Sequence, residues 1–202
     1  MTTPPEPTTP PERGFLDALD ALRRALEETG APSMIIGGVA VIALGIPRLT
    51  VDIDATVAAA HLSPERLAEA LGRQGIQARI PDAIAFARAR QVFLGVHGAS
   101  GTPVDVSLAW LPFEEEALRT CRPCDYAGVP IRIPRPEDLL IYKLIASRPR
   151  DVEDAEGLLV LHGATMNLGR VREVVSGFAR ALDDAERPQT LERLIRKTGL
   201  EA

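Results

Sequence analysis

The chain has 202 residues, of which 46% are hydrophobic and 25% charged, and its net charge is −5. These values are ordinary for a globular protein and do not fit a disordered or fibrous chain. The excess of acidic residues argues against a strongly electropositive nucleic-acid platform, and no apolar run reaches the roughly 18 residues that cross a bilayer. The sequence therefore predicts a cytoplasmic protein with no membrane partner.

Proline and threonine dominate residues 1–11, which predicts a disordered tail. Hydrophobic periodicity and turn residues then predict alternating helices and strands. Helices are expected over 12–28, 39–44, 63–74 and 83–90, and strands over 34–36, 50–57, 78–80, 92–97, 103–110 and 129–133. The turn at 98–101 is rich in glycine and serine, so the strands on either side of it should pair antiparallel.

After Pro134 the sequence predicts helices alone, over 136–147, 151–161, 167–182 and 188–197. The pattern predicts an α/β part at 12–134 and a helical part at 135–202. The two cysteines, Cys121 and Cys124, lack the further ligands of a zinc site and are interpreted as incidental reduced thiols. Trp110, the only tryptophan, is expected to lie in the core or to pack against the helical part, with base stacking as the alternative.

Two carboxylates lie two residues apart on the strand predicted over 50–57. Side chains alternate along a strand. One face would hold Arg48, Thr50, Asp52 and Asp54, and the other Leu49, Val51 and Ile53. Two like charges this close are tolerated when they are solvated or when a divalent cation lies between them, so a cation site is the first functional hypothesis.

A third carboxylate, Asp105, lies on the strand predicted over 103–110. If that strand is a neighbour of the Asp52/Asp54 strand, three carboxylates gather around one cation-sized gap. Upstream, the glycine pair Gly37-Gly38 marks a strand-to-helix turn where backbone can approach a ligand closely. A simple turn, and a solvated pair of acids, are the alternatives for these two features.

Lys143 is one of only two lysines, and Asp151 and Asp154 follow it one helical turn apart. Lys143 is a candidate ligand for phosphate, or else a surface lysine whose stem lies along apolar neighbours. Asp151 is equally well explained as the cap of its own helix.

These pieces together resemble the polymerase-β-type nucleotidyltransferase superfamily, and in particular its bacterial branch of AbiEii- and MenT-type toxins. The resemblance covers roughly residues 33–160 and comprises Gly37-Gly38, Arg48-x-Thr50-x-Asp52-x-Asp54, Asp105, Lys143-x-x-Ala146 and Arg148-x-Arg150-Asp151-x-x-Asp154. It implies an α/β fold with a mixed sheet, followed by a helical part. Gly38 stands where many members carry serine, which removes a hydroxyl contact to phosphate but keeps the backbone amide.

The resemblance also implies roles for these residues. Asp52, Asp54 and Asp105 would hold Mg²⁺ or Mn²⁺, and Asp105 would help to deprotonate the attacking hydroxyl. The nucleotide would be bound by Gly37, Gly38, Arg48, Thr50 and Lys143, and Asp151 and Asp154 would orient Lys143 or Arg48 or contact the sugar. Asp52, Asp54, Asp105 and Lys143 would be the catalytic residues.

The function expected is transfer of a nucleoside monophosphate from an NTP to an acceptor hydroxyl. The resemblance favours tRNA or a protein as acceptor, and a toxin with a cognate antitoxin, while small-molecule antibiotics stay open as acceptors. One alternative is a non-catalytic nucleotide- or partner-binding protein with the same fold. A sugar-nucleotide glycosyltransferase ranks lower, because only 51 residues precede Asp52.

Overall fold

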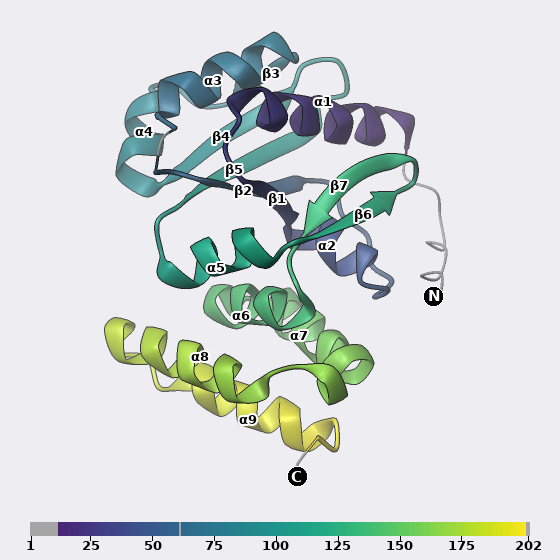
Figure 1. Ribbon diagram of the computed structural model, residues 1–202, viewed down its shortest axis with the longest axis vertical. Coiled ribbons are helices and arrows are strands. Elements are labelled where there is room, and N and C mark those ends of the chain that lie inside the picture. Colours follow the sequence, from purple (N-terminus) through teal and green to yellow (C-terminus); the bar gives the residue numbers. More distant parts are fainter. Residues whose placement is uncertain (1–11, 61, 201–202) are drawn as a thin grey trace.

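A five-stranded sheet forms the centre of the α/β part (Figure 1). The structure is a computed structural model that describes residues 12–60 and 62–200, and the tail expected at 1–11 lies outside them. In spatial order the strands are β1 (Ser33–Ile36), β2 (Ile53–Ala58), β5 (Pro103–Ala109), β4 (Val92–His97) and β3 (Ile76–Ala78). β2 and β5 run parallel and the other neighbours antiparallel, so the sheet is mixed. Both the mixed sheet and the antiparallel β4–β5 pair are confirmed.

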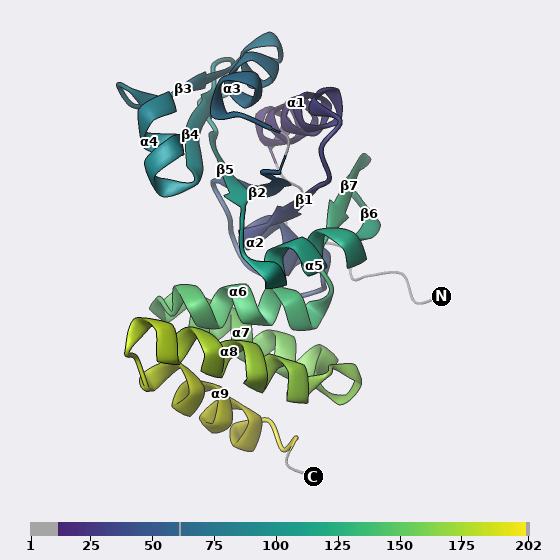
Figure 2. The ribbon, with the colours of Figure 1, turned by 60° about the vertical axis from the view of Figure 1, so that its left-hand side comes forward.

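Helices of the α/β part surround this sheet, and the remaining helices form a layer of their own beneath it, as two views agree (Figures 1 and 2). The first group comprises α1 (Arg13–Thr29), α2 (Gly37–Ala43), α3 (Pro64–Arg73), α4 (Ala83–Arg90) and α5 (Pro112–Thr120). The second comprises α6 (Pro136–Ala146), α7 (Pro149–His162), the 3₁₀ turn Gly163–Thr165, α8 (Leu168–Leu182) and α9 (Glu186–Lys197). Among the described residues, no helix is both long enough and apolar enough to cross a membrane.

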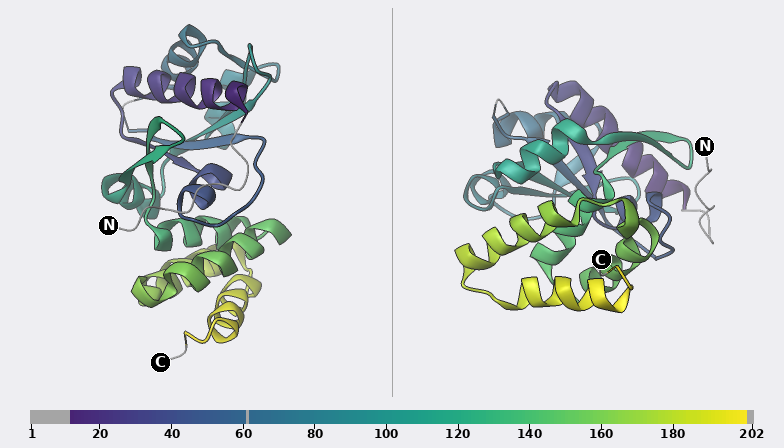
Figure 3. Two further views of the ribbon diagram at one scale, coloured as in Figure 1. Left: turned by 90° about the vertical axis from the view of Figure 1, so that its right-hand side faces the viewer. Right: turned by 60° about the horizontal axis from the view of Figure 1, so that its bottom comes forward.

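α6 lies between the sheet and the outer helices, which α8 and α9 form at the far end of the molecule (Figure 3). Leu139, Leu140, Ile141 and Leu144 are all almost completely buried. Asp138 and Lys143 of the same helix are buried too, and the position of α6 between the two layers covers the apolar and the charged side chains alike. The helical layer is therefore packed onto the α/β part through α6.

Two elements were not expected from the sequence. α5 has proline at its first turn, and Glu114 accepts hydrogen bonds from the backbone N–H groups of Trp110 and Leu111, a start signal that the sequence does contain. β6 (Arg122–Tyr126) pairs only with β7 (Val129–Ile133), in a separate two-stranded sheet. Pro123 is tolerated because β6 lies at an edge. Cys121 and Cys124 are free thiols.

Some boundaries differ from those expected. β2 begins at Ile53, and β3 covers 76–78 in place of 78–80. Leu49 and Val51 are each 77% exposed and do not share the buried face of Ile53, because the chain before Ile53 is not in the sheet. Trp110 is 64% exposed, so of its two expected placements the one in the core is wrong.

Candidate active site

The register of the two parallel strands brings two of the expected carboxylates side by side. Asp54 on β2 lies directly opposite Asp105 on β5, so the prediction that these strands are neighbours is confirmed. On the other side of β2, Asp54 lies opposite Ile36, the last residue of β1. The glycine pair that follows Ile36 is thereby placed against the Asp54 carboxylate.

Glycine is required at position 37 by the backbone conformation there and by the close approach of Asp54. Its φ is +61°, and an ideal Cβ built on it would lie 2.1 Å from Asp54 Oδ2. The helix α2 begins at Gly37 itself, two residues earlier than expected. At Gly38, a Cβ would lie 2.4 Å from Thr50 Oγ1. The segment that leads into β2 therefore folds back over this turn, and both glycines are set by close packing.

Gly37→Ala should destabilise the protein by about 1–3 kcal/mol, because alanine is strained at positive φ and its Cβ displaces Asp54. Gly72→Ala is the matched control. Gly72 lies in α3 with no atom within 4 Å of an added Cβ, so alanine there should stabilise by roughly 0.5–1 kcal/mol. Urea unfolding measures both changes, and equal effects of the two substitutions would contradict the packing at Gly37.

The charge around Asp54 is strongly negative. Burial, followed by the charges of Asp52 and Asp105, raises the pKa of Asp54 from 3.8 to about 6, while Lys143 and Arg148 act in the opposite direction. Burial also raises the pKa of Asp105, against the opposing charge and hydrogen bonds of Arg79. Three carboxylates are thus close enough to repel one another, with two cations near by.

Two of the three carboxylates are turned to other partners. Arg79 Nη2 donates to both oxygens of Asp105, at 2.7 Å each, and Thr50 Oγ1 donates to Asp52 Oδ1 at 3.0 Å. Within residues 12–60 and 62–200, no three His, Cys, Asp or Glu side chains lie close enough together to hold a metal ion. In this arrangement Asp52 and Asp105 are hydrogen-bonded to Thr50 and Arg79, and the gathering of three carboxylates around one cation stays a prediction.

A second cluster joins the loop before β2 to α6 and α7. Lys143 Nζ lies 2.8 Å from Asp154 Oδ2 and 3.1 Å from Asp151 Oδ1, and Arg48 also pairs with Asp154. Lys143 is buried, so it is not a surface lysine. Asp151 in addition accepts a hydrogen bond from the backbone N–H of Arg148 at 3.3 Å, and so caps α7. Asp151 and Asp154 together thus contact Lys143 and Arg48, and their role in orienting these cations for a nucleotide, or in contacting its sugar, stays a prediction.

The sequence assigns no role to Arg79 or Arg148, yet both act on the carboxylates. Arg148 lies in the Arg-x-Arg-Asp part of the pattern described above, which could have singled it out. Arg79 follows a three-residue strand and carries no sequence signal. Arg150 also reaches this region, where it donates to the backbone oxygen of Leu49 and holds the loop against α7.

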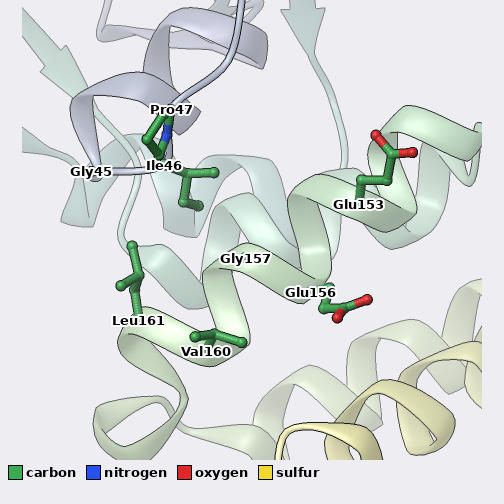
Figure 4. Close-up of a pocket in the computed structure, with 8 residues that line it drawn as sticks. All are labelled: Gly45, Ile46, Pro47, Glu153, Glu156, Gly157, Val160 and Leu161. Carbon is green, nitrogen blue, oxygen red and sulfur yellow. The ribbon is translucent and has the colours of Figure 1, made fainter. Parts of the chain in front are cut away.

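A cavity of about 500 Å³ lies beside these clusters and does not contain them. Its apolar wall includes Ile46, Pro47 and Val160, and Glu153 and Glu156 extend from α7 along one side (Figure 4). Glu156 is already paired with Lys197 at 2.7 Å. None of the carboxylates of β2 and β5 lines it, so this cavity is not the candidate active site.

Comparison with protein-family models finds no match, and comparison with curated proteins finds none. Solved structures do match. A solution structure of the antibiotic-resistance factor ANT(2'')-Ia is 19% identical over 91% of each chain, with a TM-score of 0.51. A crystal structure of ANT(2'')-Ia in complex with adenylyl-2''-tobramycin is 18% identical over 85% of this chain and 99% of that one, with a TM-score of 0.55.

The crystal structure of JHP933 from Helicobacter pylori is similar too: it is 16% identical over 95% of each chain, with a TM-score of 0.55. At such identities the likeness concerns the fold. The chain shares the fold of these structures, with a mixed α/β core followed by helices, and the fold class expected from the sequence is confirmed.

Proposed function

We propose that this protein is a metal-dependent nucleotidyltransferase, which moves a nucleoside monophosphate from an NTP to an acceptor hydroxyl. The observation that carries the proposal is the register of β2 and β5, which places Asp54 against Asp105 and two residues from Asp52. The nucleotidyltransferase-like fold supports it. Lys143 and Arg148, whose charges reach Asp54, supply the positive side of the same site.

The carboxylates fit a hard divalent cation. Burial and the like charges of Asp52 and Asp105 raise the pKa of Asp54. A cation between Asp52 and Asp54 would relieve the repulsion between these carboxylates. Mg²⁺ is commonly held by one or two carboxylates and substrate phosphates, and Mn²⁺ accepts similar oxygen ligands. Asp52 and Asp54 would hold the ion, and Asp105 would join them on leaving Arg79. When bound, the ion neutralises charge on the phosphates.

The residues of this chain then have separate tasks. Asp105 takes the proton of the acceptor hydroxyl, whose oxygen forms a bond to the α-phosphorus. The bond from that phosphorus to the bridging oxygen breaks, and its electron pair leaves with pyrophosphate. Lys143 and Arg48 neutralise the triphosphate, and Asp151 and Asp154 position them. Gly37, Gly38 and Thr50 bring backbone and hydroxyl groups to the nucleotide.

The acceptor follows from the resemblance and from the neighbours. The AbiEii- and MenT-type resemblance favours tRNA or a protein hydroxyl in the cytoplasm, and a toxin paired with an antitoxin. The ANT(2'')-Ia structure with adenylyl-2''-tobramycin adds an aminoglycoside to the acceptors that should be tested. The acidic net charge disfavours RNA slightly, because contacts to phosphate need Lys and Arg.

The test offers the full chain each of the four α-labelled NTPs with Mg²⁺ and, separately, total tRNA, lysate protein and an aminoglycoside mixture. Label should reach one acceptor with the wild type and with Asp17→Asn, an exposed control on α1, but not with Asp52→Asn plus Asp54→Asn. Label that is unchanged in the double variant, or absent with every NTP and acceptor, would reject the proposal.

A nucleotide-binding protein without turnover is the second candidate. It is favoured by the engagement of Asp105 with Arg79, which keeps the proposed base from the acceptor. Calorimetric binding of an NTP, with no product from any acceptor in the assay above, would favour it over the enzyme.

A further inference from the structure

Arg79 reaches the proposed site from the opposite edge of the sheet. It follows β3, and its backbone N–H donates to the oxygen of Leu94 at 3.1 Å. Leu94 lies directly opposite Asp105 in the β4–β5 pair. The guanidinium therefore crosses one strand, β4, to reach a carboxylate on the next, and its backbone is fixed by the sheet.

The geometry of the contact is that of a cation on a carboxylate. A single nitrogen, Nη2, lies 2.7 Å from Oδ1 and 2.7 Å from Oδ2, so it lies between the two oxygens. This is where a cation held by both oxygens of Asp105 would lie. Asp105 cannot give both oxygens to Arg79 and to a divalent ion at once, because the two charges would overlap in space.

The contact is also weak enough to be exchanged. The side chains of Arg79 and Asp105 are 37% and 29% exposed, and an ion pair open to solvent contributes only about 0–1 kcal/mol. The pairs of Lys143 and Arg48 with Asp154 are buried by comparison. Of the cation–carboxylate pairs at the site, the one at Asp105 is thus easy to displace.

We propose that Arg79 is a positioning residue that competes with the divalent cation for Asp105, an inference that rests on the proposed function. Arg79 engages both oxygens of Asp105, and an ion that binds all three carboxylates must displace it. A divalent ion can therefore bind all three carboxylates only after the Arg79–Asp105 contact breaks, and the free energy of that contact is subtracted from the binding of the ion.

The test measures Mn²⁺ binding to the full chain by the electron paramagnetic resonance signal of free Mn²⁺, without nucleotide or acceptor. Arg79→Gln should bind Mn²⁺ up to about fivefold more tightly than the wild type, the factor that corresponds to about 1 kcal/mol. Arg79→Lys keeps the charge and should bind as the wild type does. Arg73→Gln breaks the exposed pair with Glu28 and should change nothing.

The gain must also disappear when Asp105 is neutralised, so Arg79→Gln plus Asp105→Asn should bind no more tightly than Asp105→Asn. Unchanged or weaker binding in Arg79→Gln, or a gain that persists in the Asp105→Asn background, would overturn the inference. If the protein transfers nucleotides but Arg79→Gln does not bind Mn²⁺ more tightly, the inference about Arg79 is wrong and the proposed function stands. If Arg79→Gln binds Mn²⁺ more tightly but no nucleotide is transferred, the proposed function is wrong and the competition at Asp105 stands.

Discussion

Asp54→Asn should abolish nucleotidyl transfer and at the same time make the folded protein more stable. Asparagine keeps the shape of the side chain but removes the charge that the proposed ion needs. Removal of one preorganised electrostatic group at an active site costs roughly 10²–10³-fold in rate, and we expect at least that loss. Label transfer to the acceptor measures it, with Asp17→Asn as the control.

The gain in stability has a definite sign and pH range. Folding raises the pKa of Asp54 from 3.8 to about 6, mainly by burial and then by the charges of Asp52 and Asp105. A carboxylate with a raised pKa destabilises the folded state wherever it is ionised, and a shift of about two units corresponds to up to about 3 kcal/mol. The cost is fully present above pH 6 and disappears as the pH falls from about 6 to 3.8.

Urea unfolding in EDTA at two pH values separates this effect from others. At pH about 7.5 the Asp54→Asn protein should have the higher midpoint, and near pH 4 the two proteins should agree. Asp17→Asn should follow the wild type at both. A lower midpoint for Asp54→Asn at neutral pH would show that the carboxylate contributes favourable contacts and not repulsion.

The sequence contains the chemistry of the candidate site but not its geometry. Asp52 and Asp54 can be singled out because two acidic residues at alternate positions need an explanation. Asp105 adds a third carboxylate to them on the condition that its strand is a neighbour. The register of β2 and β5, which decides that Asp54 faces Asp105, depends on how the whole sheet assembles. Local alternation even misplaced Leu49 and Val51, because the chain leaves the sheet before Ile53.

Arg79 shows why part of the site could not be predicted. Its partner lies 26 positions further along the chain and two strands away, and nothing in the residues around it distinguishes it from other surface arginines. Lys143 could be singled out because lysine is rare in this chain. Only its burial in the structure excludes the interpretation as a surface lysine. Long-range contacts set the protonation and orientation of these groups, and a single sequence does not record such contacts.

The attachment of the helical layer depends on one buried carboxylate. Asp138, on α6, is completely buried; it accepts from Arg135 Nε at 2.8 Å and lies 2.7 Å from Nη1 of Arg170 on α8. Glu116, on α5, lies 3.2 Å from Arg170 Nη2 and 3.4 Å from Arg135 Nη2. Three helices thus meet at one network, and Asp138 is the member with no access to water.

Asp138→Ala should lower the free energy of unfolding by about 3–5 kcal/mol, because it leaves the guanidinium of Arg170 buried without its closest partner. Glu192→Ala is the matched control. It breaks a pair of the same type, Arg172–Glu192 between α8 and α9, with both side chains more than 40% exposed, and should cost less than about 1 kcal/mol. Urea unfolding followed by circular dichroism gives both values. Equal midpoints for the two variants would mean that apolar packing of α6 alone attaches the helical layer.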